Sequence, residues 1–253
     1  MGVLKPWDLF EAGQSDEELI ENVREQAIHA VSYMALDRGI SLQVLNEMRI
    51  GYDPREIKIT IPHFWKGDLL GWQKRAMTSS KYPMTPDVVD EDGSTRPAPK
   101  YQNSLNLPKA ETLYNYDNVV ETEPLFVTES PLSVLKGKTY GKEFSNVVAT
   151  FGAKVTDNQL KWLKKFPVIY LAFDPDFAGH IGTVRMARYL VNYSNVKVME
   201  FPSDYDFGSV SRANLQTSLE VAQPLLTALP RIDRLISKKR EEIAIRKAQR
   251  GKQ

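Results

Sequence analysis

The pattern of hydrophobic and polar positions divides the chain into two parts with different periods. At the start, apolar residues at three- and four-residue spacing predict a helix that opens with a capping box at Ser15 and Glu18 and ends before Gly39. A second helix is expected after Ser41, which can cap it. The apolar face of this second helix is expected to consist of Leu42, Leu45 and Met48.

From Ile57 the hydrophobic period changes to two. The runs IKITIPHF and LLGWQKRAM flank the residues Trp65-Lys66-Gly67-Asp68, which predicts a β-hairpin. Residues 78–99 are rich in Pro, Ser, Thr and Asp, so a long mobile loop is expected there. Residues 99–104 read PKYQNS and are expected to form a short polar turn.

The second part alternates short apolar runs with helical spacing. Four such runs, PLFVT, NVVATFG, VIYLAF and NVKVMEF, are expected to be strands. Ser130 with Pro131, and Thr156 with Gln159, have the residue types of helix starts. Strands that alternate with helices in this way predict a parallel sheet with right-handed crossovers, and therefore an α/β fold.

Composition excludes several classes of protein. The chain has 253 residues, a formal net charge of +1 and no cysteine, which excludes disulfides and every cysteine-containing zinc site. Its three histidines are too scattered to predict a metal site. No apolar run approaches a membrane span, and the N-terminus lacks the apolar segment of a signal peptide, so we expect an intracellular protein that contacts no membrane.

Five carboxylates follow the predicted strands. They are Glu129, Asp174, Asp176, Asp204 and Asp206. The carboxyl ends of parallel strands meet at one edge, where like charges repel unless cations are bound. All-oxygen ligands favour Mg²⁺ or Mn²⁺, which serve phosphoryl or nucleotidyl transfer. An acid at a strand-to-helix turn is also a common helix cap, and this second interpretation of Asp174 and Asp176 stays open.

Two basic segments admit both a structural and a binding interpretation. The residues PKYQNS combine a cation, an aromatic ring and amides, which can hold a phosphate backbone and stack a base, although composition alone favours a solvated loop. The helical tail from Arg231 ends in a basic cluster. A solvated terminal helix is the simpler interpretation of that tail, and contact with nucleic acid or a partner is the alternative.

Together these motifs resemble a known family. Glu129 after one strand and DPDFAG after a later strand resemble the TOPRIM domain of bacterial-type primases, topoisomerases and some nucleases. The upstream segments RGIS, IGYDP, IPHF, LLGWQKR and PKYQNS are similar to the N-terminal half of the catalytic core of DnaG-like primases. FPSDYDF resembles the primase segment that carries a second acid pair. The resemblance covers residues 25–224.

The resemblance implies a role for each matching residue. Glu129 is expected to be the acid/base or metal-organising glutamate, with Asp174 and Asp176 as catalytic and metal-binding acids and Asp204 and Asp206 as further metal ligands. The expected cofactor is Mg²⁺ or Mn²⁺.

The resemblance also implies a basic groove for template or incoming nucleotide. Its expected members are Arg75, Lys100, Tyr101 and, as a weaker member, Asn103.

Some positions depart from the family pattern. The family has Gly after the glutamate and Asp four residues beyond it, whereas this chain has Ser130 and Ser133. Phe177 and His180 stand where the family often has polar or basic residues. The family's zinc-binding module cannot be present in a chain without cysteine, and we expect its function to be supplied by other chains or dispensed with.

The resemblance implies a TOPRIM parallel-sheet domain at 119–208. A mixed α/β primase subdomain is expected at 1–118, and a helical segment with a basic tail at 209–253. The expected function is DNA-dependent synthesis of short RNA primers on single-stranded DNA by two-metal nucleotidyl transfer, in a phage-like setting in the bacterial cytoplasm. The expected partners are single-stranded template, ribonucleoside triphosphates and either a replicative helicase or a separate zinc-binding primase subunit.

Two alternatives remain open at the level of the sequence. A TOPRIM metal-dependent nuclease would use the same acids to cleave phosphodiesters. A non-catalytic replisome or nucleic-acid-binding protein would keep the fold and lose the activity, which Ser133 slightly favours.

Overall fold

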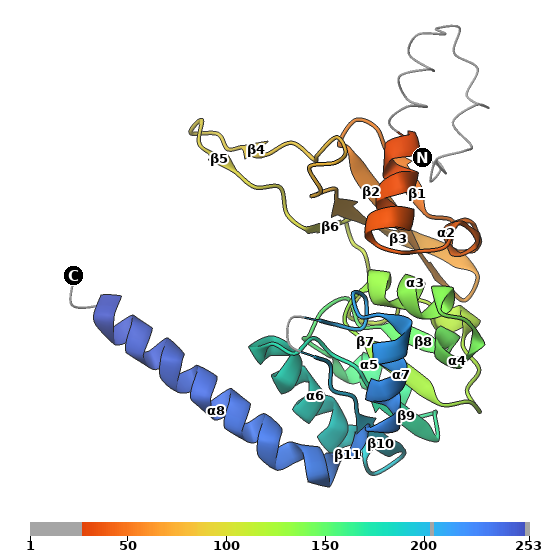
Figure 1. The fold of residues 1–253 in the computed structure, drawn as a ribbon, viewed down its shortest axis with the longest axis vertical. Coiled ribbons are helices and arrows are strands. Elements are labelled where there is room, and N and C mark those ends of the chain that lie inside the picture. The colour runs from red at the N-terminus through yellow and green to blue at the C-terminus, as the bar shows by residue number, and fades with distance from the viewer. Residues whose placement is uncertain (1–26, 203–204, 251–253) are drawn as a thin grey trace, which may run out of the picture. The chain divides into compact units, whose positions relative to one another are not determined.

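The computed structural model describes residues 27–202 and 205–250, which fall into two units, Met1–Pro108 and Lys109–Gln253 (Figure 1). Each unit has its own sheet and core. Within the described residues, no helix combines the length and the apolar composition needed to cross a membrane.

The first unit is built on an antiparallel sheet with the strand order β1-β2-β3-β6. Its strands are β1 (Gly51–Asp53), β2 (Lys58–Trp65), β3 (Asp68–Ala76) and β6 (Tyr101–Asn103), and a separate ribbon consists of β4 (Val88–Val89) and β5 (Thr95–Arg96). Residues 27–32 are helical and continue into the π-helical turn η1 (Tyr33–Asp37), and α2 (Leu42–Glu47) follows.

The predicted hairpin is confirmed. Strands β2 and β3 pair along their length, and the turn between them places Lys66 and Gly67 at φ angles of 54° and 86°. Two consecutive residues with positive φ give the turn a twist that matches the twist of the strands, and glycine adopts such an angle without steric cost.

The helical predictions for this unit are confirmed in part. Ala27, Ala30 and Met34 are buried, as the first apolar stripe requires, while its capping box at Ser15 and Glu18 lies outside the described residues. Ser41 caps α2 by accepting the Val44 N–H at 3.2 Å.

The predicted apolar face of α2 is wrong in one member. The helix buries Val44 and Leu45, whereas Leu42 is 58% exposed. Leu42 is the first residue of a six-residue helix, and a helix this short buries little more than one turn.

The prediction of a polar turn at residues 99–104 is also wrong. Tyr101–Asn103 is strand β6, which pairs with β3 in the register Arg75↔Tyr101 and Gln73↔Asn103. The outer edge of β3 carries backbone groups that need partners, and this requirement outweighs the polar composition of the segment. The expected loop at 78–99 contains the ribbon β4–β5.

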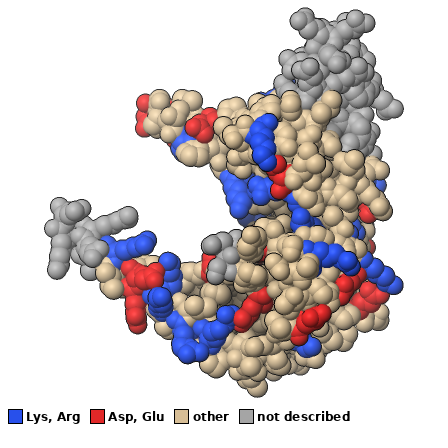
Figure 2. All heavy atoms as spheres, viewed as in Figure 1, with Lys and Arg blue, Asp and Glu red and all other residues tan. Residues whose placement is uncertain are grey.

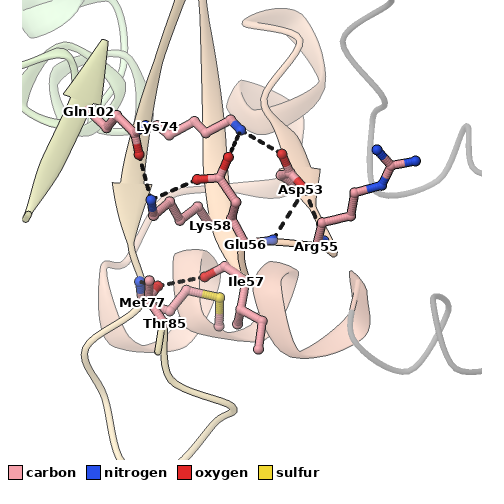
Figure 3. Close-up of polar contacts among 9 residues, drawn as sticks. All are labelled: Asp53, Arg55, Glu56, Ile57, Lys58, Lys74, Met77, Thr85 and Gln102. Atoms are coloured by element: carbon pink, nitrogen blue, oxygen red, sulfur yellow. Dashed lines mark hydrogen bonds and ion pairs between the residues drawn. The ribbon is translucent and has the colours of Figure 1, made fainter. Parts of the chain in front are cut away.

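A polar network fixes one side of this sheet (Figure 3). Lys74 Nζ lies 2.6 Å from carboxylate oxygens of both Asp53 and Glu56. Lys58 Nζ donates to Glu56 at 2.7 Å and to Gln102 at 2.5 Å. Because the side chains come from β1, β2, β3, β6 and the β1–β2 turn, the network ties the registers of four strands together.

The second unit contains a five-stranded sheet with the order β11-β10-β9-β7-β8, parallel except for its short edge strand β11. The strands are β7 (Leu125–Thr128), β8 (Val147–Ala149), β9 (Val168–Leu171), β10 (Asn195–Val198) and β11 (Gln223–Pro224). The helices are η2 (Tyr116–Asn118), α3 (Pro131–Thr139), α4 (Lys142–Ser145), α5 (Asp157–Leu163), α6 (Phe177–Leu190), α7 (Arg212–Glu220) and α8 (Leu225–Arg250). The predicted parallel sheet is therefore confirmed.

Both predicted helix starts of this unit are confirmed. Ser130 accepts the Ser133 N–H at 3.3 Å, ahead of a proline in the first turn of α3. Thr156 and Gln159 form a reciprocal capping box with distances of 3.2 and 3.0 Å. These caps set where each helix leaves the sheet.

The last helix, α8, packs against α6 and β10 of the second unit. Residues Ala228, Ile232 and Ile236 of α8 form a buried cluster with Val184 of α6 and Val198 of β10. Tyr114 pairs with Ala149 beside β8, so residues 109–118 also belong to this unit. The boundary between the units thus falls at 108/109, ten residues before the expected 118/119.

Candidate active site

The candidate active site lies where the parallel strands of the second unit end. Val127 of β7 and Val198 of β10 are both register partners of Leu171 in the central strand β9. Counting two residues onward along each strand brings Glu129, Phe173 and Glu200 to the same level. Asp174 follows Phe173 directly, so acidic groups from three neighbouring strands meet at one edge.

Glu129 is fixed at this edge by hydrogen bonds at both of its ends. Its Oε1 accepts the backbone N–H of Asp174 at 3.0 Å, and its carbonyl accepts the N–H of Gly152 at 2.9 Å. Burial raises the pKa of Glu129 to about 8, with further contributions from the charges of Asp174, Asp176 and Asp206. The structure therefore brings four of the five predicted acids into electrostatic contact.

The turn DPDFAG serves as a helix start as well as an acid pair. Asp176 is the N-cap of α6, and its Oδ1 accepts the Gly179 N–H at 2.8 Å. Asp174 does not cap the helix. The interpretation of these acids as helix caps is therefore confirmed for Asp176, through its Oδ1, and not for Asp174.

Gly179 is required by the close approach of α6 to the acids. A Cβ atom at this position would collide with the carbonyl oxygen of Asp174 and would lie 2.7 Å from Glu129 Oε1. The absence of a side chain lets α6 pack this closely against Asp174 and Glu129.

The second acid pair is described in part, because Asp204 lies outside the described residues. The carbonyl of Asp206 accepts the N–H groups of Ser209 and Val210 at 3.2 and 3.0 Å. Among the described residues, Asp206 Oδ1 is buried and has no hydrogen-bond partner. A buried carboxylate oxygen without a donor is costly, and a cation is one way to satisfy it.

These residues fit a hard divalent cation. The donors are carboxylate oxygens, and among the described residues one of them, Asp206 Oδ1, is buried without a hydrogen-bond partner. In residues 27–202 and 205–250, no three acidic or histidine side chains already converge on one point as a preformed metal site. Such a cation would therefore be held by few side chains, as is usual for Mg²⁺ sites that share their ligands with phosphates.

Ser133 occupies the position where the resemblance leads one to expect a further acid. It is 2% exposed, and its Oγ lies 3.1 Å from Ser130 Oγ. A Cβ on Gly208 would lie 3.1 Å from Ser133 Oγ and 3.4 Å from Asp206 Oδ1. The serine therefore packs under the turn that carries Asp206, and the site has one fewer negative charge there.

Glu200 belongs to this edge, although the sequence analysis did not select it. Its position two residues beyond Val198 corresponds to that of Glu129 beyond Val127. The signal was available in the sequence, since Glu200 is the one acid within the fourth predicted strand, NVKVMEF. It forms an ion pair with Arg231 of α8.

Three of the predicted nucleic-acid residues lie on β3 and β6 of the first unit, and the fourth, Lys100, directly precedes β6. Arg75 Cζ is 4.9 Å from the centroid of the Tyr101 ring, and Lys100 Nζ is 6.0 Å from the same centroid. Asn103 Oδ1 accepts the Gln73 side-chain amide at 2.9 Å. Arg75 is 3% exposed, while Lys100 is exposed.

A positive field surrounds Arg75. Burial favours the neutral phenol of Tyr33, yet the charges of Arg75 and Arg38 and the hydrogen bonds from Arg38 outweigh this effect and lower the pKa of Tyr33. Tyr33 and Arg38 line a cavity of about 480 Å³ together with Thr78, Ser79 and Lys81 of the long loop, and Leu36 and Asp37 complete its wall. Within this lining Lys81 forms an ion pair with Asp37 at 3.2 Å.

Comparison with known proteins finds a matching family and related DNA primases. Residues 126–210 match the Toprim-like family. A DNA primase of Staphylococcus aureus (strain MSSA476) is 34% identical over 117 residues, which are 43% of this chain and 19% of the relative. The chain therefore spans about a fifth of the length of that relative.

Solved structures share the fold. A DnaG primase catalytic domain bound to single-stranded DNA matches 79% of this chain with 76% of its own, at a TM-score of 0.60 and 19% identity. The zinc-binding and RNA polymerase domains of Aquifex aeolicus primase match 85% of this chain with 62% of theirs, at a TM-score of 0.61 and 19% identity.

A phage protein shares the same fold. The primase fragment of the bacteriophage T7 primase-helicase protein matches 73% of this chain with 71% of its own, at a TM-score of 0.52 and 18% identity. The chain is therefore related to bacterial DNA primases and has the fold of a DnaG catalytic core, with a Toprim-like domain over residues 126–210.

Proposed function

We propose that this protein is the catalytic core of a DNA primase, which synthesises short RNA primers on single-stranded DNA. The observation that supports this function best is the acidic edge itself: the half-buried Glu129 accepts the Asp174 N–H, and the charges of Asp174, Asp176 and Asp206 act on it. Carboxylates in this arrangement suit nucleotidyl transfer, because that chemistry depends on positioning and on electrostatic stabilisation of phosphate oxygens.

In the proposed reaction, the 3′ hydroxyl of one nucleotide forms a bond to the α-phosphorus of the next, and the bond to pyrophosphate breaks. Asp174, Asp176, Asp206 and, outside the described residues, Asp204 would hold Mg²⁺ or Mn²⁺. Such ions lower the pKa of an attacking hydroxyl and stabilise the leaving oxygen. Glu129, oriented by the Asp174 N–H, would accept or organise the proton of the hydroxyl.

The first unit would bind the template. Arg75, Lys100, Tyr101 and Asn103 combine positive charge with an aromatic face and an amide, a combination that suits phosphates and stacked bases. The exposed Lys100 would contact phosphate directly. The buried Arg75 would act by fixing the Tyr101 ring and by adding to the positive field.

We also propose that the protein works with a partner chain. One related structure contains a zinc-binding domain beside its polymerase domain, and another belongs to a primase-helicase protein. These 253 residues contain no cysteine, so a zinc module of the cysteine type would lie outside them. A separate zinc-binding subunit or a replicative helicase would supply initiation-site choice or delivery to the template.

The function is tested by incorporation of labelled ribonucleotides on single-stranded DNA with Mg²⁺ and then with Mn²⁺. Asp174→Asn should reduce synthesis by about 100-fold or more, because it removes a proposed metal ligand while keeping the shape of the side chain. Asp157→Asn is the matched control, since Asp157 is an exposed acid of the same unit whose carboxylate pairs with Arg185.

Three outcomes contradict the proposal. One is Asp174→Asn with wild-type synthesis. A second is degradation of the DNA without ribonucleotides, which would indicate a TOPRIM nuclease. The third is an absence of both synthesis and metal binding, with and without a zinc-binding primase subunit, which would indicate a non-catalytic replisome protein.

A further inference from the structure

A cluster at the sheet edge includes a cation contributed by the last helix. Glu200 lies one residue beyond Met199, whose N–H still donates to Leu171 of β9 at 2.9 Å and so extends the pairing of β10. Glu200 therefore comes from a strand end beside that of Asp174. Its carboxylate forms an ion pair with the guanidinium of Arg231.

The surroundings of His180 place Arg231 near Asp176 and Glu200. His180 follows Asp176 by one helical turn, and its N–H donates to the Asp176 carbonyl at 2.9 Å. Burial lowers the pKa of His180, and the charge of Arg231 lowers it further while those of Asp176 and Glu200 oppose the change. His180 thus lies within electrostatic reach of Asp176, Glu200 and Arg231.

The backbone that carries Arg231 is held firmly. Its neighbours on the helix, Ala228 and Ile232, are both 1% exposed in the cluster with Val184 and Val198. The side chain itself is 48% exposed, and that of Glu200 is 31% exposed. An arginine that is anchored at its base and open at its tip can bind a ligand with little loss of order.

From this arrangement we infer that Arg231 binds the pyrophosphate portion of the nucleoside triphosphate at the acidic edge. The inference rests on the proposed function, which places a triphosphate at these acids. A guanidinium has five N–H donors and binds phosphate oxygens through two parallel bonds. Glu200 holds the arginine in position before the ligand arrives and competes with the phosphate for it.

The alternative role for Arg231 is purely structural. In that case its pair with Glu200 would serve to attach α8 to the sheet. The apolar cluster of α8 already provides that attachment, and an ion pair exposed to this degree contributes little to stability. Figure 2 shows further basic side chains along α8. Arg234 and Lys238 belong to the same helix and supply controls.

Binding of magnesium pyrophosphate to the full chain, measured by calorimetry, tests the inference. Arg231→Gln should weaken binding about 10- to 100-fold, the loss expected for charge-assisted hydrogen bonds. Arg231→Lys should restore part of the affinity, because lysine keeps the charge and loses the paired geometry. Arg234→Gln should bind like wild type, since the Arg234 Nε donates to the Pro230 carbonyl of its own helix.

Glu200→Gln separates the two roles of the ion pair. If Arg231 binds phosphate, removing its competitor should leave affinity unchanged or increase it. If the pair serves only to attach α8, Glu200→Gln and Arg231→Gln should weaken binding together and lower the melting temperature together, and that result would overturn the inference. Wild-type affinity in Arg231→Gln, or no binding by the wild type, would overturn it as well.

The binding measurement also distinguishes this inference from the proposed function. Pyrophosphate binding that depends on Arg231, in a protein that makes no primers even when a zinc-binding primase subunit is added, would count against the function and leave the binding site intact. Primer synthesis with an unchanged KM for ribonucleotides in Arg231→Gln would leave the function intact and remove Arg231 from the site.

Discussion

At the scale of single residues, the environment of Glu129 opposes its ionisation. Its pKa is raised from 4.5 to about 8, first by burial and then by the neighbouring carboxylates. Between these two values the folded protein keeps a proton that the unfolded chain has released. The free energy of unfolding therefore falls as the pH rises from 4.5 to 8, and above this range the loss is complete.

This coupling predicts a pH-dependent response to metal. In EDTA, the melting temperature of the wild type should fall from pH 5 to pH 8 more steeply than that of Glu129→Gln, which has no proton to lose at this position. Mg²⁺ should stabilise the wild type more at pH 8 than at pH 5, because it compensates the ionised carboxylates. Equal slopes for the two proteins in EDTA would show that Glu129 does not titrate in this range.

Asp176 has two roles that substitution can separate. Asn is as good an N-cap as Asp, so Asp176→Asn should preserve stability while removing the charge, and primer synthesis should fall strongly. Asp176→Ala should lose synthesis and also about 1 kcal/mol of stability, because the hydrogen bond to Gly179 disappears. Urea unfolding and ribonucleotide incorporation on the same samples test both parts. Full activity in Asp176→Asn would reduce the residue to a helix cap.

At the scale of elements, the capping box of α5 should contribute to stability without contributing to catalysis. Thr156 Oγ1 accepts the Gln159 N–H, and Thr156→Ala should cost about 1 kcal/mol of unfolding free energy. Thr122→Ala, in an exposed segment before β7, is the control and should change nothing. The urea midpoints of both variants measure the change in stability. Primer synthesis by the same samples measures any change in catalysis. A large loss of synthesis in Thr156→Ala would contradict a purely structural role for this helix start.

At the scale of the whole molecule, the two units should have separable roles. Residues 109–253 contain a complete sheet, a buried core and the described acids of the edge. Expressed alone, this unit should fold cooperatively and bind Mg²⁺, yet it should not make primers, because the proposed template residues are in the other unit. Circular dichroism, metal titration and the incorporation assay provide the measurement. Primer synthesis by residues 109–253 alone would show that the first unit is dispensable.

The sequence by itself determined where the helices and strands of the molecule lie. Hydrophobic period, together with the residue types at Ser41, Ser130 and Thr156, located helices and strands, because caps and alternation depend on neighbours within a few residues. The order of strands and helices then predicted that their acids share one edge. The sequence alone therefore identifies Glu129 and Asp174 as candidate site residues.

Only the tertiary structure decided features that depend on distant partners. Residues 101–103 form a strand because they pair with the outer edge of β3. The composition of the segment does not show that this edge lies beside it. The raised pKa of Glu129 needs burial and three other acids around one carboxyl group. Arg231 meets Glu200 only because a helix from the end of the chain packs beside β10. Long-range packing, which a local pattern cannot specify, thus places Arg231 beside Glu200 at the end of β10.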